Sequence, residues 1–202
     1  MAKHNRPLQL LMLISFALGM CLFNVEAFWQ PKLHELLAGN HYQGYGYLAF
    51  TGFVMAALGP ALYGALCRNI QASLTAQMIV IFFMIMGGLV WLGVQQNIWG
   101  FCLAYLLLML LVSLLGVPAQ LMVNQHSRPD QHASVFSIMS LLSQCGGALS
   151  SFALSPLIER WGVSAIWVYL GMGMAVIMLV WSLFRLMPWH ADIANKSRIP
   201  PR

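Results

Sequence analysis

Among the polar side chains that lie within or beside the long apolar stretches of this sequence, where polar groups are rare, five are candidates for binding or proton exchange. They are one carboxylate and four amides: Glu26, Gln30, Gln120, Asn124 and Gln144. An ionisable group inside a membrane span is a default functional hypothesis, because it can bind and release a proton. Amides can donate and accept hydrogen bonds to a solute. We therefore treat these five residues as the candidate substrate or coupling pathway.

Glu26 and Gln144 each have an alternative role. Glu26 lies about 27 Å along a helix from Leu8, close to the outer membrane surface, where water can solvate its charge. Gln144 lies about 17 Å into its apolar stretch and so near the bilayer midplane. An amide without a partner is costly there. Gln144 therefore either contacts a solute or makes an interhelical hydrogen bond, which is usually worth about 0.6 to 2 kcal/mol.

Six apolar stretches must position these residues. They cover residues 8–28, 45–66, 74–94, 99–123, 133–158 and 163–186. A helix needs about 20 apolar residues to cross the hydrocarbon of a bilayer, and continuous rather than alternating hydrophobicity favours helices over barrel strands. The composition agrees, with 60% hydrophobic and 7% charged residues. The sequence thus predicts an all-α, polytopic membrane protein: a cytoplasmic segment 1–7, a six-helix transmembrane bundle 8–188 and a cytoplasmic tail 189–202.

The positive charges predict the orientation. Only Lys32 and Arg160 fall on the side away from the N-terminus. Eight cations fall on the N-terminal side: Lys3, Arg6, Arg68, Arg128, Arg185, Lys196, Arg198 and Arg202. Because loops rich in Lys and Arg resist translocation, both termini are predicted to be cytoplasmic in a cell (inner) membrane. The net charge of +5 then indicates attraction to anionic lipid headgroups rather than to nucleic acid.

The sequence has no motif for enzymatic catalysis, metal binding or cofactor binding. It lacks G-x-S-x-G, H-x-x-x-H and H-E-x-x-H, and its four cysteines form no C-x-x-C. Each of these chemistries needs its groups at such fixed spacings. We therefore expect no catalytic residue, metal or cofactor, and we expect the cysteines to be packing residues.

Polar and small residues recur three, four or seven positions apart in the first, fourth and fifth stretches, which places them on single helix faces. The first stretch carries Ser15, Gly19, Glu26 and Gln30; the fourth carries Ser113, Gly116, Gln120 and Asn124. The fifth carries Ser137, Ser140, Gln144, Gly147, Ser151 and Ser155. The second carries the small residues Gly52, Ala56, Gly59, Pro60 and Gly64, which let membrane helices approach closely. The third and sixth are almost wholly apolar, which predicts peripheral, lipid-facing helices.

The order polar-faced, small-faced and apolar therefore occurs twice. Since three is an odd number of crossings, the second triplet must enter the membrane from the opposite side, as in the inverted repeats of secondary transporters. A short identity agrees with this repeat, GPAL at 59–62 against GGAL at 146–149.

This pattern resembles the C-terminal half of a major facilitator superfamily transporter over about residues 7 to 188. The segment FNVEAFWQPKL at 23–33 and the run 134–171, with GGALSS and IERWG inside it, also resemble the family. The resemblance implies that the first and fourth helices line a central cavity, the second and fifth face the other half, and the third and sixth lie outside. The family's G-x-x-x-D-R-x-G-R loop is reduced here to Gly64 and Arg68.

A transporter of this type needs two six-helix halves, and 202 residues supply one. We expect either a half-transporter or truncated transporter that meets a second six-helix half, or a homodimer. It would move a small solute, with Glu26 as the candidate for proton coupling. The alternative is a membrane-embedded structural or assembly subunit whose polar stripes only hold helices together, as such stripes can.

Overall fold

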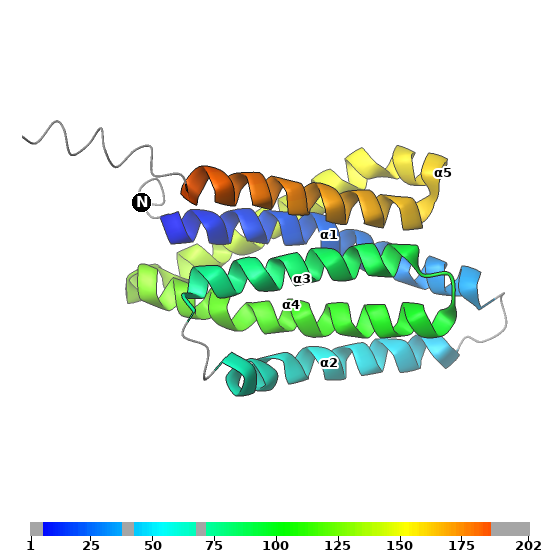
Figure 1. Ribbon diagram of the computed structural model, residues 1–202, viewed down its shortest axis with the longest axis horizontal. Coiled ribbons are helices and arrows are strands. Elements are labelled where there is room, and N and C mark those ends of the chain that lie inside the picture. The colour runs from blue at the N-terminus through cyan, green and yellow to red at the C-terminus, as the bar shows by residue number, and fades with distance from the viewer. Residues whose placement is uncertain (1–5, 38–42, 68–71, 187–202) are drawn as a thin grey trace, which may run out of the picture.

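The structure, a computed structural model, describes residues 6–37, 43–67 and 72–186, and this part of the chain is helical without any strand. In order, the elements are α1 (Arg6–Leu36), α2 (Gln43–Cys67), α3 (Leu74–Val94), α4 (Ile98–His126), the short 3₁₀ helix η2 (Pro129–Gln131) and α5 (His132–Leu186) (Figure 1). The prediction of an all-α protein is confirmed for these residues. Five of their helices are long and apolar enough to cross a membrane, as expected of a multi-pass membrane protein.

α1 is longer at both ends than its apolar stretch. It begins at Arg6, so residues 6 and 7 belong to the helix, whereas residues 1–5 and the predicted tail 189–202 lie outside the described residues. The predicted end at residue 28 is wrong for the helix, which continues to Leu36 through Pro31. Trp29 and Leu33 explain the extension, because both are buried, one turn apart, on the packed side of the helix.

The predicted break between residues 158 and 163 is present and is confined to Gly162. Helical geometry runs from His132 to Leu186 except at Gly162, whose φ of 79° and ψ of 161° break it. Only glycine adopts this conformation without steric cost. The chain reverses direction there (Figure 1), so α5 consists of a first arm, residues 132–161, and a second arm, residues 163–186. At 1.5 Å per residue the arms are about 45 and 36 Å long, enough for each to cross a membrane.

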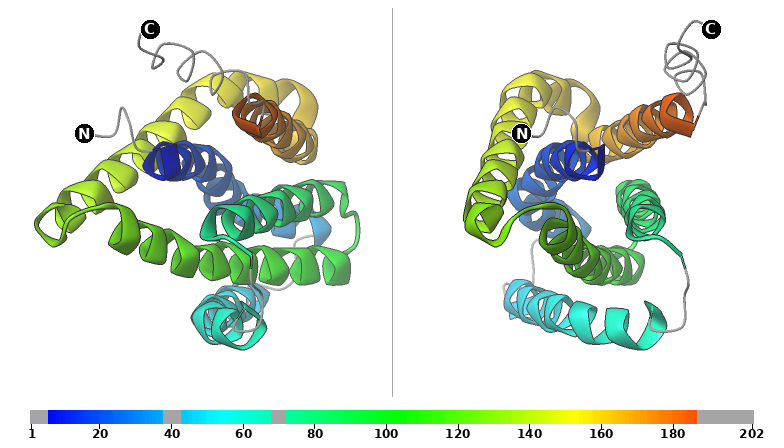
Figure 2. Two further views of the ribbon diagram at one scale, coloured as in Figure 1. Left: turned by 60° about the vertical axis from the view of Figure 1, so that its left-hand side comes forward. Right: turned by 90° about the vertical axis from the view of Figure 1, so that its left-hand side faces the viewer.

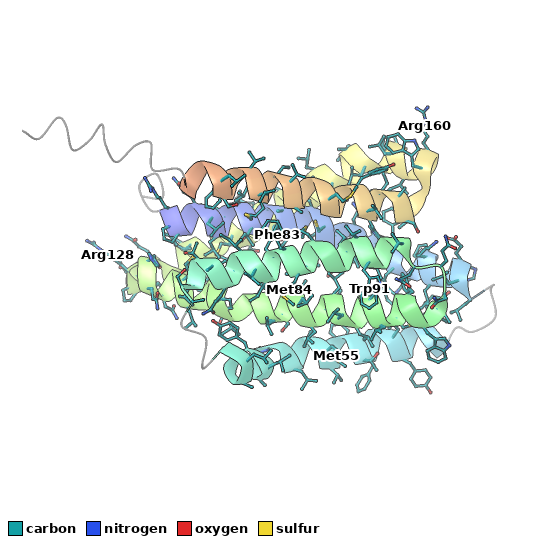
Figure 3. The ribbon with its side chains drawn as sticks, in the orientation of Figure 1. Met55, Phe83, Met84, Trp91, Arg128 and Arg160 are labelled. Atoms are coloured by element: carbon teal, nitrogen blue, oxygen red, sulfur yellow. The ribbon has the colours of Figure 1, made fainter. Side chains whose placement is uncertain are left out.

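The helices pack in defined pairs. α1 packs chiefly against α5, α2 against α4, and α3 against both α4 and α5 (Figure 2). α3 supplies much of the core, including the fully buried side chains of Phe82 and Met86. Its other face is apolar and exposed at Met84 and Trp91 (Figure 3). The predicted lipid-facing place of residues 74–94 therefore holds for one face of α3 only.

Glycines set the closest approaches between helices. A Cβ at Gly19 of α1 would overlap the backbone of Ser143 in the first arm of α5, and one at Gly59 of α2 would overlap Ser113 in α4. Ser113 also donates a hydrogen bond to the Ala56 carbonyl across the same joint. Small residues thus bring α1 to α5 and α2 to α4 within this chain, as expected where van der Waals packing drives helix association in membranes.

Gly19→Ala is expected to lower the free energy of unfolding by about 1–3 kcal/mol, since the added methyl group meets backbone that cannot rotate away. Gly87→Ala is the matched control, because nothing lies within 4 Å of a Cβ there. Alanine favours the helix by about 1 kcal/mol over glycine, so this control should be neutral or stabilised. Denaturant unfolding in detergent micelles measures both. Equal behaviour of the two variants would contradict the close α1–α5 joint.

Candidate functional site

The first arm of α5 has three distinct faces. Ser143, Gly146 and Ser150 turn toward α1 and are buried or half-buried. Leu141 and Phe152 form an exposed apolar face, with exposed fractions of 62% and 87%. The polar stripe lies between these faces and is exposed along its length: Ser137, Ser140, Gln144, Ser151 and Ser155. Packing within the chain therefore does not explain this stripe, although it does explain Gly147, which is buried beneath the Phe23 ring.

Glu26 is exposed on the surface of α1 and lies away from both ends of that helix. The helix continues ten residues past it to Leu36, about 15 Å. Glu26 lies within electrostatic range of Tyr105, which is seven residues, about 10 Å, into α4 from its start at Ile98. The carboxylate therefore lies deeper than the end of its helix, where the sequence alone would place it.

An aromatic cluster ties Glu26's end of α1 to its neighbours. The Trp29 ring centroid is 5.3 Å from that of Tyr105 in α4 and 6.4 Å from that of Tyr45 in α2. The Tyr45 hydroxyl is 2.9 Å from Nδ1 of His34. Gln30 and His34 line an open recess of about 420 Å³ beside Tyr45. The cluster fixes the rotation of α1, and so fixes the direction in which Glu26 and Gln30 face.

The structure does not gather the five candidates into one site. No hydrogen bond or ion pair joins any two of them in the described part of the chain, and all five are exposed. Gln144 follows Ser143, which lies against Gly19, about 10 Å along α1 from Glu26. Gln120 and Asn124 lie about 22 and 28 Å along α4 from Tyr105. The candidates are therefore spread along the length of the bundle, from one end to the other.

One buried polar pair was missed by sequence reasoning. Nδ2 of Asn24 donates a hydrogen bond to Oγ of Ser150, and both residues are at most 2% exposed. Oδ1 of Asn24 has no partner in the described part of the chain. An amide within an apolar stretch was a signal that could have revealed Asn24. The residue was missed because it lies on the side of α1 away from Glu26 and so outside the polar face. The pair joins α1 to the first arm of α5 at the level of the candidate pathway.

The chain matches no family model, no curated protein and no solved structure. Membership of the major facilitator superfamily is therefore not established by similarity. The candidate residues have to be judged by their own geometry.

That geometry suits binding and proton exchange rather than covalent catalysis. An exposed carboxylate can take up a proton or pair with a cationic group. Exposed amides and hydroxyls can replace the water shell of a polar solute. All of these groups lie on helices whose packing is fixed elsewhere, by the core of α3 and by the glycine joints. Rigid helices are the support that a binding surface needs.

Proposed function

We propose that this chain is one six-helix half of a secondary transporter of the major facilitator type. Together with a second six-helix half, or with a second copy of itself, it moves a small solute across the cell (inner) membrane. The observation that carries the proposal is the exposed polar surface within membrane-crossing helices: Glu26 on α1 and the stripe around Gln144 on the first arm of α5.

Such a surface is costly against lipid. A charged side chain at the centre of a membrane helix costs about 2.5–3.5 kcal/mol by insertion measurements, and such groups face a water-filled cavity or a partner. The exposed apolar residues Leu141 and Phe152 already provide a lipid-compatible face on the same arm. In this proposal the stripe is therefore a second surface, which contacts water or a partner rather than lipid. A solute pathway between two bundles requires such a surface.

The helix pairing supports an inverted repeat. In such a repeat, α1 is equivalent to α4, α2 to the first arm of α5, and α3 to the second arm. The pair of α1 with the first arm is then equivalent to the pair of α4 with α2. Both pairs are present, and each sets a glycine against a serine: Gly19 with Ser143, and Gly59 with Ser113. The α3–second arm pair maps onto itself and is present at Gly93 and Gly171. Six crossings in two inverted triplets are the architecture of each half of a major facilitator transporter.

The charges support the orientation with cytoplasmic termini. Arg6 begins α1 at the same end of the bundle as Arg128, whereas Arg160 lies at the opposite end (Figures 1 and 3). Lys32 lies near the end of α1 away from Arg6 and pairs with Glu35 at 3.0 Å. The loop around Arg68 lies outside the described residues. The excess of cations that favours the Arg6 end as cytoplasmic comes from the sequence, because most of the other cations on that side lie outside the described residues.

The place of the second bundle differs from the sequence-based expectation. Gly52 and Gly59 of the small-residue face on α2 are buried against α4 and are not available to a partner. Pro60 and Gly64 remain exposed, as does the α5 stripe. The partner surface in this proposal is therefore the stripe together with the outer side of α2.

Water access to the stripe tests the proposal. In a chain whose four cysteines are replaced, Ser140→Cys in native membranes is expected to react with a charged, membrane-impermeant thiol reagent about tenfold faster than Leu141→Cys, because the reacting thiolate needs water. Both positions are exposed, but they lie on different faces of the arm.

Equally slow reaction would leave the stripe dry and favour the assembly subunit over a transporter. Equally fast reaction at both positions would place the arm outside the membrane and contradict both functions. Unfolding measurements on the two variants provide the control for intact structure.

A further inference from the structure

A second polar surface lies at the end of the bundle where α1 begins and α4 ends. A cavity of about 690 Å³ opens there between α1, α4 and the start of α5. Its apolar wall includes Leu8, Met12 and Ile138, and its polar rim includes His126, Arg128 and Gln131. None of these residues belongs to the candidate pathway.

The rim carries the cation Arg128, and the exposed carboxylate Asp130 lies two residues away in η2. Arg128 is exposed and makes no ion pair in the described part of the chain, whereas Lys32 at the other end is paired with Glu35. His126 and His132 turn ring nitrogens to main-chain carbonyls of Met122 and Ser127, at 3.1 and 3.2 Å, which holds the corner between α4 and α5 in place. The corner therefore presents the Arg128 guanidinium from a hydrogen-bonded frame. A guanidinium suits phosphate, because its planar donors contact two oxygens at once.

The apolar wall runs inward from this rim. Leu8 and Met12 are one turn apart on α1, and Ile138 faces the same cavity from α5 with 43% of its surface exposed. Since α1 and α4 both span the membrane, the rim lies at headgroup depth and the wall lies at the depth of the first acyl carbons. A polar rim with the guanidinium of Arg128, which makes no ion pair in the described residues, lies above an apolar wall, and this arrangement matches an amphiphile with an anionic head.

We propose that this cavity binds an anionic phospholipid, with the phosphodiester on Arg128 and Gln131 and an acyl chain along Leu8, Met12 and Ile138. The site requires only that the helices span a bilayer, so it does not depend on transport. An anionic lipid held here contacts α1, the end of α4 and the start of α5 together. Arg128 supplies the attraction and the cavity supplies the shape.

Native mass spectrometry of the purified full chain in detergent tests the site, with dioctanoyl-phosphatidylglycerol as the probe. Arg128→Gln is expected to lower phosphatidylglycerol binding about fivefold, the effect of one cation near a lipid headgroup. Arg160→Gln is the matched control, because Arg160 is also exposed and unpaired in the described part of the chain but lies at the opposite end (Figure 3). Its binding should equal that of the wild type. Dioctanoyl-phosphatidylcholine should bind weakly to all three proteins.

A second variant tests the cavity rather than the charge. Ser134 lines the cavity, so Ser134→Trp should fill it and reduce phosphatidylglycerol binding while the chain stays folded by circular dichroism. Unchanged binding in both Arg128→Gln and Ser134→Trp would overturn the proposal. So would an equal fall in Arg160→Gln, which indicates general surface charge. Displacement of the lipid by millimolar inorganic phosphate would also overturn it, by identifying a free-anion site.

Discussion

Glu26→Gln is expected to slow solute uptake at least ~10-fold, equivalent to about 1.4 kcal/mol of barrier, and to remove the pH dependence of transport. The amide cannot gain or lose a proton, but it has nearly the same shape as the carboxyl group. Glu26 is exposed and lies one turn before Trp29, whose ring contacts that of Tyr105, about 10 Å into α4. The measurement is uptake across a range of pH into proteoliposomes that hold the chain with its partner half or as a dimer. The probe is the best-transported member of a panel of small solutes.

Glu35→Gln is the control for this experiment. Glu35 is an exposed carboxylate on the same helix, but it lies one residue before the end of α1 and pairs with Lys32. The same change of charge at this position should leave transport unaltered. The amount of folded Glu26→Gln protein should match the wild type, because an exposed side chain contributes little to packing. Wild-type kinetics across pH would return Glu26 to a solvated role and leave Gln144 as the remaining candidate.

Local sequence signals predicted the helices well where tertiary packing did not oppose them. The stretch 74–94 forms α3 with both ends as predicted, because Ser73 caps its first turn and polar residues follow Val94. The end of α1 was missed because Pro31 and Lys32 are typical stop signals. Burial of Trp29 and Leu33 outweighs them. The break predicted between residues 158 and 163 is present, and a single glycine, Gly162, is sufficient for the reversal.

The sequence predicted which candidate residues share a helix face, but it did not predict which helices pack against that face. Spacing of three and four residues placed Ser140 and Gln144 on one exposed stripe. The resemblance implied that the second stretch, which contains Gly59, faces another six-helix half, whereas α4 of the same chain covers Gly59. Periodicity shows which residues share a face and carries no information on what covers that face. The Asn24–Ser150 bond spans 126 residues of sequence, so only the packing of α1 on α5 reveals it.

The proposed two-bundle assembly can be tested at Ser151, which lies on the exposed stripe of α5. If the stripe faces a second bundle, a diazirine-bearing amino acid at Ser151 should cross-link to protein in native membranes when illuminated. The same amino acid at Phe152, one position along and 87% exposed on the apolar face, should yield lipid adducts only. The contrast is sharp because successive helix positions are turned by about 100°.

The mass of the Ser151 product identifies the partner. Twice the 22.5 kDa of this chain indicates a homodimer, and a different mass identifies a separate second half. Both products support a two-bundle assembly, because a transport pathway in this architecture lies between two bundles. A stripe that faces lipid would instead give only lipid adducts at Ser151, as at Phe152. That outcome contradicts the half-transporter, because the exposed serines and Gln144 would then have neither water nor a partner, at a depth where unsatisfied polar groups are costly.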